Sequence, residues 1–249
     1  MILRPASVKP PQVQQSRSVS ALPIWNAIFA TQQQPPGWFI TQADHAHLAG
    51  EIAARISSPQ FPRLSPEIVQ AISLHDEGWH DCDSHGPARS FITVGPADFL
   101  PAWRGSIQAA ERVSPLGAAM VSGHFVRLAR TRMQMTEDTL ENKQLIEDFV
   151  KAESARHRNL LRELPDGANT IEELTDVLQF CDVFSLYLCG GAAEPVEFPQ
   201  KFAGTKFKLR RDGETYRSKP HLFREKTGLK VSATEIATNR RVTLEFELQ

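Results

Sequence analysis

The segment 170–190 constrains the fold of this chain most strongly, because its pattern predicts a helix that is apolar nearly all round. Apolar side chains recur at intervals of three and four residues, and aromatic side chains fill the other sides: Ile171, Leu174, Leu178, Phe180, Cys181, Phe184, Tyr187 and Leu188. Such a helix belongs at the centre of a globular core. Beyond its first two turns its one acid is Asp182, and a buried carboxylate needs a cation. The segment therefore predicts a central helix that carries part of a cation site.

A helix predicted over residues 42–57 places one histidine on its apolar face. His45 heads a stripe at helical spacing that continues through Leu48, Ala49, Ile52, Ala53 and Ile56. His47 falls instead on the polar side of the same helix, with Glu51 and Arg55. We therefore expect His45 to point inward and His47 to point outward.

Two further predicted helices repeat this arrangement. The first has Ser65 as its N-cap and runs to about residue 77, with an apolar stripe that leads to His75 and Asp76. The second follows Ser114 and carries His124, with Arg127 about one turn further on. Ionisable side chains on inward faces are unfavourable unless they are paired or bind a metal ion. The candidate metal ligands are His45, His75, Asp76, His124 and Asp182.

This ligand set suits a divalent ion, with room for one or two. Imidazole nitrogens and carboxylate oxygens together favour Mn, Fe, Co, Ni or Zn, whereas Mg is favoured less by imidazole. Asp76 and His80 are the candidate catalytic residues; His80 could donate a proton or simply lie in a loop. Arg127 could bind a substrate phosphate, or form an ordinary ion pair with a nearby acid.

The chain divides into three segments by composition. Residues 1–37 contain an irregular stretch rich in Pro and Gln, within which residues 24–29 could form a short helix. Residues 38–194 carry the helical patterns. Residues 195–249 change to β-type patterns: Asp212-Gly213 predicts a tight hairpin, and residues 242–248 alternate as a half-buried strand does.

The stretch Leu74-His75-Asp76-Glu77-Gly78 resembles the signature of the HD superfamily of metal-dependent phosphohydrolases. That superfamily has a first His, then His-Asp, often further histidines, and a final Asp on a later helix, and residues 38–190 follow this order. The chain is similar, more closely still, to an HD-related bacterial family of unknown function, through residues 1–5, 40–46, 74–79 and 182–189. The resemblance implies a mainly α, HD-type helical bundle, to which the C-terminal residues add a small antiparallel β element.

By the same resemblance, the implied activity is hydrolysis of a small phosphorylated compound, a nucleotide being one candidate. One or two metal ions would bind the phosphoryl oxygens, with Asp76 able to bridge them, and a metal-bound hydroxide would attack. Two alternatives stay open. Some HD-fold enzymes use such ligands in a dinuclear iron centre for oxygen chemistry, and a non-catalytic binding or regulatory module could keep the metal for stability.

Charge and composition add weaker expectations. The net charge is −1, but residues 201–241 hold twelve Lys and Arg against four Asp and Glu. This local excess could favour phosphate-bearing ligands or could be solvated surface, and without a stacking motif it does not favour nucleic acid. The sequence contains no long apolar run and no signal-peptide pattern, and its three cysteines form no disulfide framework. We expect a cytoplasmic protein with no membrane partner; a homo-oligomer stays open.

Overall fold

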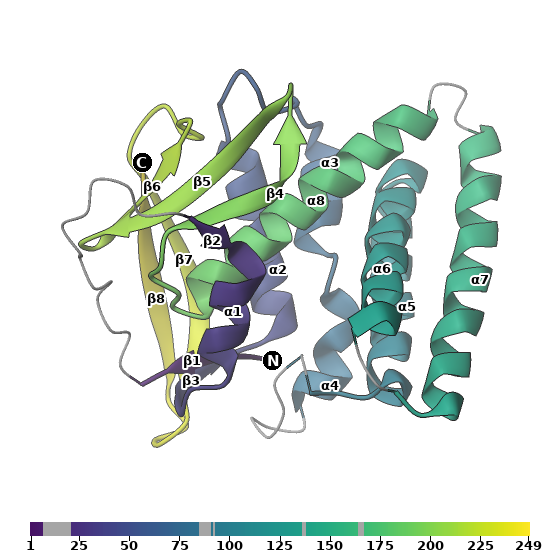
Figure 1. Cartoon of the computed structure of the whole chain (residues 1–249), viewed down its shortest axis with the longest axis horizontal. Helices are drawn as coiled ribbons and strands as arrows, with labels where there is room; N and C mark the ends of the chain where they lie inside the picture. The colour runs from purple at the N-terminus through teal and green to yellow at the C-terminus, as the bar shows by residue number, and fades with distance from the viewer. Residues whose placement is uncertain (7–20, 85–90, 92, 136–137, 164–166) are drawn as a thin grey trace.

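The protein consists of a curled β-sheet packed against a group of helices (Figure 1). The structure, a computed structural model, describes residues 1–6, 21–84, 91, 93–135, 138–163 and 167–249. In Figure 1 the sheet lies on the left and α5, α6 and α7 lie on the right. The long helix α8 (Gly167–Cys189) runs diagonally between the two parts and contacts both of them.

The sheet has eight strands in the order β1-β3-β7-β8-β6-β5-β4-β2. It is mixed, because the pairs β2–β4 and β6–β8 are parallel whereas the other neighbours are antiparallel. Strands from both ends of the sequence contribute to it. They are β1 (Ile2–Pro5), β2 (Leu22–Pro23), β3 (Pro36–Ile40), β4 (Val196–Phe202), β5 (Thr205–Asp212), β6 (Thr215–Lys219), β7 (Thr227–Glu235) and β8 (Arg241–Leu248).

The two β features expected near the C-terminus are confirmed. Asp212 pairs with Thr215 across the β5–β6 turn, where Gly213 has a φ of 64°, a conformation that glycine adopts without strain. The alternating segment 242–248 lies within β8, which pairs along its whole length with β7. Local alternation and turn residues were therefore sufficient to predict these elements.

Two of the helices begin at side-chain caps, and one of these caps, Ser65, was predicted from the sequence. Thr41 accepts a hydrogen bond from the backbone N–H of Asp44, and Ser65 accepts one from that of Ile68. The helices are α1 (Ile24–Gln32), α2 (Gln42–Arg55), α3 (Pro66–Ser73), the 3-10 helix η1 (Glu77–Trp79), α4 (His80–Ser84), α5 (Pro96–Glu111), α6 (Pro115–Met135), α7 (Leu140–Glu163) and α8. The short helix expected at residues 24–29 is thus part of α1.

Two predicted helix boundaries are wrong. The second helix was expected to reach residue 77, but α3 ends at Ser73, so His75 and Asp76 lie in the turn between α3 and η1. The central helix was expected to begin at Thr170, but α8 begins three residues earlier, at Gly167. His75 and Asp76 are nevertheless buried. Their inward position comes from the turn rather than from a helical stripe.

The central position predicted for α8 is confirmed. Phe180 and Phe184 are fully buried and pack against Phe198 of β4, with ring centroids 4.2 and 5.6 Å apart. On another side, α8 packs against α2 and α6. Because these helices carry the candidate ligands, α8 brings the helical part of the core and the sheet to a common centre.

The expected mainly α fold, with a small C-terminal β element, is wrong. The sheet is large, and three of its strands precede α2 in the sequence. The resemblance to the HD superfamily is wrong for the same reason, since an eight-stranded curled sheet around a central helix is not a helical bundle. Of the Pro- and Gln-rich stretch, residues 7–20 lie outside the described residues, and residues 21–37 contribute β2, α1 and the start of β3. Among the described residues, no helix is long and apolar enough to cross a membrane.

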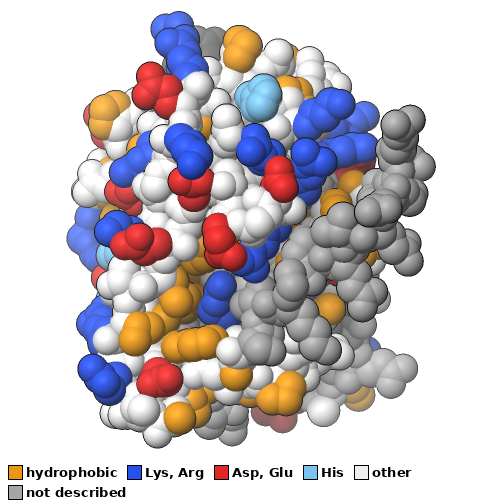
Figure 2. Space-filling view, turned by 90° about the vertical axis from the view of Figure 1, so that its left-hand side faces the viewer, with side chains coloured by type: hydrophobic (Ala, Val, Ile, Leu, Met, Phe, Trp, Pro, Cys, Tyr) orange, Lys and Arg blue, Asp and Glu red, His pale blue; other side chains and the backbone are white. Residues whose placement is uncertain are grey.

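The basic segment 201–241 lies mostly on the sheet, and many of its cations are paired with acids. Figure 2 shows Lys and Arg side chains interspersed with Asp and Glu on one face of the molecule. Ion pairs include Lys206 with Glu197, Arg217 with Asp212, and Lys230 with Glu245. The pairing favours the interpretation of this segment as solvated surface.

Candidate metal centre

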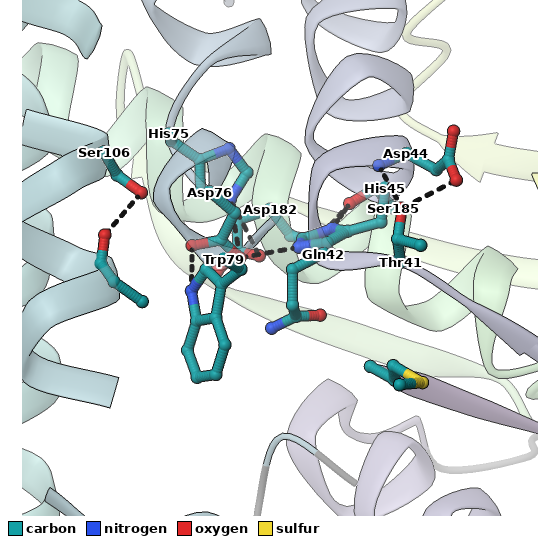
Figure 3. Close-up of polar contacts among 12 residues, drawn as sticks. Thr41, Gln42, Asp44, His45, His75, Asp76, Trp79, Ser106, Asp182 and Ser185 are labelled. Carbon is teal, nitrogen blue, oxygen red and sulfur yellow. Dashed lines mark hydrogen bonds and ion pairs between the residues drawn. The ribbon is translucent and has the colours of Figure 1, made fainter. Parts of the chain in front are cut away.

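Five ionisable side chains from four parts of the chain meet in the protein interior. His45 comes from α2, His124 from α6 and Asp182 from α8, while His75 and Asp76 come from the turn after α3. All five are buried. The structure thus brings together every candidate ligand predicted from the sequence, and Figure 3 shows His45, His75, Asp76 and Asp182 converging.

His45 is oriented by a chain of hydrogen bonds. The Ser185 hydroxyl donates to the Asp182 carbonyl oxygen at 2.8 Å and lies 2.8 Å from His45 Nδ1. Because that hydroxyl proton is already used, Ser185 Oγ accepts from Nδ1–H of His45. The other ring nitrogen, Nε2, lies 2.9 Å from Oδ2 of Asp76. His45 therefore directs Nε2 at the carboxylate.

His75 presents an unpaired nitrogen to the cluster. Its Nδ1 donates to the Ile72 carbonyl oxygen at 2.8 Å, which directs Nε2 toward the carboxylates. Nε2 lies 3.5 Å from Asp182 Oδ1 and 3.8 Å from Asp76 Oδ2, and it has no hydrogen-bond partner among the described residues. A buried polar atom of this kind needs an explanation. A cation that bridges the nitrogen and the carboxylates would supply one.

The separations within the cluster fit metal coordination. Bonds of 2.0–2.2 Å to nitrogen and oxygen place neighbouring ligands about 3.0 to 3.4 Å apart in octahedral or tetrahedral geometry. His45, His75 and Asp182 offer three ligand atoms that all lie within 4.8 Å of one another. Asp76 adds an oxygen 2.9 Å from His45, and His124 Nε2 lies 3.8 Å from Asp182 Oδ2. The residues present therefore fit one divalent ion.

The electrostatics of the cluster favour a positive charge at His75, carried either by its own imidazolium or by a cation bound to its Nε2. Burial works to lower the pKa of His75, but the charges of Asp76 and Asp182 outweigh it and raise that pKa to about 9. Burial would raise the pKa of Asp76, yet His75 and His45 hold it below its usual value. At His124 burial prevails over the pull of Asp182 and lowers the pKa to about 4. His124 is therefore neutral near pH 7 and able to act as a ligand.

The turn that carries Asp76 is fixed by contacts that the sequence patterns did not reveal. The indole N–H of Trp79 donates to Asp76 Oδ1 at 3.0 Å, and the backbone N–H of Gly78 donates to Ser106 Oγ at 3.0 Å. A side chain at Gly78 would place its Cβ 2.1 Å from the Ala102 carbonyl oxygen of α5. The turn is therefore pressed directly against α5, and this contact sets the direction of the Asp76 carboxylate.

The cluster borders a cavity of about 440 Å³. His45, Asp76, His124 and Asp182 form part of its wall. Half of the other lining residues are aromatic: Trp25, Phe29, Trp79, Phe91, Phe99, Trp103 and Phe125. Gln42 also lines it, and its buried Oε1 has no hydrogen-bond partner within the described parts of the chain. In Figure 3 the side chains of Gln42 and Trp79 extend to the same side of the cluster.

Two other predicted site residues lie apart from the cluster. His80 is exposed, and its Nε2 lies 2.9 Å from Glu77 Oε1. Arg127 forms ion pairs with Glu172 and with Asp176, the latter at 2.6 Å. Neither residue lines the cavity described above. Of the two interpretations of Arg127, this position favours the ordinary ion pair.

Sequence reasoning missed the residues that support the ligands. Ser185 lies three residues after Asp182 on α8, and this spacing on one helix face could have indicated its role. Trp79 lines the cavity and donates a hydrogen bond to Asp76. The contribution of α1 to the cavity, through Trp25, Asn26 and Phe29, has no counterpart in the sequence patterns.

Comparisons with known proteins identify a family for this chain but no function. No curated protein and no solved structure matches the chain. One protein family does match, over residues 28–237, and it is described as protein of unknown function (DUF3891). The match covers most of the chain and includes all five clustered residues. The chain therefore belongs to the DUF3891 family of proteins of unknown function.

Proposed function

We propose that this protein is a metal-dependent hydrolase of a small phosphorylated compound, with one divalent ion held by His45, His75 and Asp182. Asp76 and His124 stand close enough to complete the coordination. The observation that carries the proposal is His75 Nε2, which has no hydrogen-bond partner in the described parts of the chain and lies 3.5 Å from Asp182 Oδ1 inside the protein. The proposal rests on this arrangement and not on membership of the HD superfamily.

The chain's own residues supply the remaining parts of the reaction. A divalent ion at this position would lower the pKa of a bound water molecule and polarise a phosphoryl oxygen. Asp76 is the carboxylate suited to orient that water and accept its proton, because Trp79 holds Oδ1 and leaves Oδ2 directed into the cluster. His124 also lines the cavity, and its Nε2 lies 3.8 Å from Asp182 Oδ2, so it can complete the coordination of the ion.

The cavity supports a phosphoryl substrate only together with the metal ion. Arg132 lines the cavity, but its guanidinium already pairs with Asp138 at 3.1 Å. The clustered carboxylates Asp76 and Asp182 would repel a phosphate dianion. Binding of a phosphorylated substrate should therefore depend strictly on the divalent ion.

The test is phosphate release by the protein loaded with Mn²⁺ or Co²⁺ across a panel of small phosphate esters, nucleotides included. We expect turnover that chelation abolishes and that Asp76→Asn lowers by a factor of about 100 or more. Turnover that is indifferent to chelation, or that survives Asp76→Asn in full, would contradict the proposal. Melting shifts caused by phosphate esters without turnover would indicate a binding module instead.

A second candidate is an iron-dependent oxygenase. Its support is the ligand set itself, because two histidines and one carboxylate are the set found in non-haem Fe(II) oxygenases. Iron in the purified protein, together with oxygen uptake and no phosphate release, would favour this candidate. Phosphate release with Mn²⁺ or Co²⁺ would favour hydrolysis.

We also propose a cytoplasmic location. The three cysteines are free thiols, and Cys181 and Cys189 are buried in the core. Burial raises the pKa of both thiols, so they remain protonated and unreactive. This use of cysteine suits a reducing compartment.

A further inference from the structure

The cavity beside the cluster carries more aromatic surface than metal chemistry alone requires. Two groups of rings contribute to its wall. On α1, Trp25 and Phe29 stack with their centroids 5.5 Å apart. On α5 and α6, Trp103 contacts Phe99 at 4.4 Å and stacks on Phe125 at 4.9 Å. A wall built in this way presents ring faces and edges to whatever enters.

The aromatic side chains of this wall favour binding of the organic part of a ligand over binding of a phosphoryl group alone. A volume of about 440 Å³ is within the range of small-molecule sites, so it can hold more than a phosphoryl group. Aromatic walls favour planar rings, which stack or pack edge to face with them. Arg132 offers little to a second anionic group, because its guanidinium pairs with Asp138 and lies over the Phe99 ring at 5.1 Å.

We propose that the substrate carries a planar aromatic group and that this cavity binds it, with the reacting group turned toward the metal ligands. The inference deepens the proposed function and rests on it, because the metal-bound end of the substrate is taken as the reacting end. Trp25 is a specificity-determining residue in this proposal. It precedes residue 28, where the family match begins, so α1 adds to the cavity a side chain from outside the matched region.

The preference of the cavity for an aromatic ring can be tested separately from phosphate-ester hydrolysis. Hydroxamates bind divalent metals whatever the substrate is, and benzohydroxamate differs from acetohydroxamate by a phenyl ring in place of a methyl group. Three of the four tryptophans, Trp25, Trp79 and Trp103, line the cavity, so quenching of tryptophan fluorescence reports binding. The protein is loaded with Zn²⁺ or Mn²⁺ and titrated with each hydroxamate.

We expect benzohydroxamate to bind about tenfold more tightly than acetohydroxamate, or better, since only the former buries a ring. Trp25→Leu should reduce this preference about threefold or more, while acetohydroxamate binds as before. Trp38→Leu is the matched control, because Trp38 is also partly buried but lies on β3 and does not line the cavity. It should leave the preference unchanged.

Equal affinity for the two hydroxamates would overturn the inference, as would a preference that Trp25→Leu leaves intact. Failure of both hydroxamates to bind the metal-loaded protein would overturn it too, because the ligands would then not face the cavity. None of these results depends on phosphate release. A strong ring preference in a protein that hydrolyses no phosphate ester would contradict the proposed hydrolysis and support the ring site.

Discussion

His75 Nε2 and Asp182 Oδ1 lie 3.5 Å apart in the core, and the nitrogen has no hydrogen-bond partner among the described residues. The contact is too long for a good N–H···O hydrogen bond, for which about 2.9 Å is typical. It matches the separation of two ligands on one metal ion, about 3.4 Å in tetrahedral geometry. A protonated His75 would leave its N–H unsatisfied, whereas a bound cation would satisfy both atoms.

The hydrogen bond from Trp79 to Asp76 should affect metal affinity. Trp79→Phe keeps an aromatic ring in place but removes the indole N–H that Asp76 Oδ1 accepts. We expect metal affinity to fall about tenfold, because supporting hydrogen bonds orient ligands and tune their basicity. Competition with a chromophoric chelator measures the affinity. Trp38→Phe, on β3, is the control, and equal affinities for the two variants would show that Trp79 does not position Asp76.

Gly78 should tolerate no side chain. In Gly78→Ala the new Cβ would meet the Ala102 carbonyl oxygen at 2.1 Å, and backbone atoms cannot move aside cheaply. We expect the free energy of unfolding to fall by about 3 kcal/mol or more, measured by urea denaturation. Gly228→Ala in β7 is the matched control, since its Cβ meets no atom within 4 Å among the described residues. Similar stability for the two variants would refute the close packing of the turn on α5.

Arg127 should contribute to stability rather than to metal binding. Its guanidinium pairs with Glu172 and Asp176 at a partly exposed position. We expect Arg127→Met to lower the free energy of unfolding by about 1 kcal/mol or less, as such surface pairs do. Metal content, measured on the same preparation, should be unchanged. A loss of phosphate-ester affinity with unchanged stability would revive the interpretation of Arg127 as a phosphate ligand.

Helical periodicity was sufficient to predict that the candidate ligands are buried. His45, His124 and Asp182 each lie on an apolar face of a helix, and a polar residue on such a face can be recognised from spacing alone. His75 and Asp76 were also predicted to be buried, although the helix expected to carry them ends at Ser73. The burial of these two residues was predicted correctly because α3 packs its apolar face against the core, and the turn that follows the helix starts from that buried position.

The sheet could not be predicted in the same way, because strands do not reveal their partners locally. β1 and β3 are short, and β3 pairs with β7 from the far end of the sequence, with Phe39 opposite Thr234. The sequence pattern of residues 21–37 is irregular, yet these residues form α1, whose aromatic side chains line the cavity. The order of His and Asp motifs suggested the wrong superfamily, because a similar order of ligands can occur on different folds.

The most direct test of the account is the metal content of protein purified without chelators, measured by elemental analysis on the wild type, His75→Ala and His47→Ala. His47 is the matched control, because it lies on α2 near His45 but faces solvent. We predict about one divalent ion per chain in the wild type and in His47→Ala. His75→Ala, once circular dichroism has shown that it is folded, should retain less than about a tenth of the wild-type metal content. Equal metal content in the two variants, or none in the wild type even after exposure to Mn²⁺, Fe²⁺, Co²⁺, Ni²⁺ and Zn²⁺, would contradict the account.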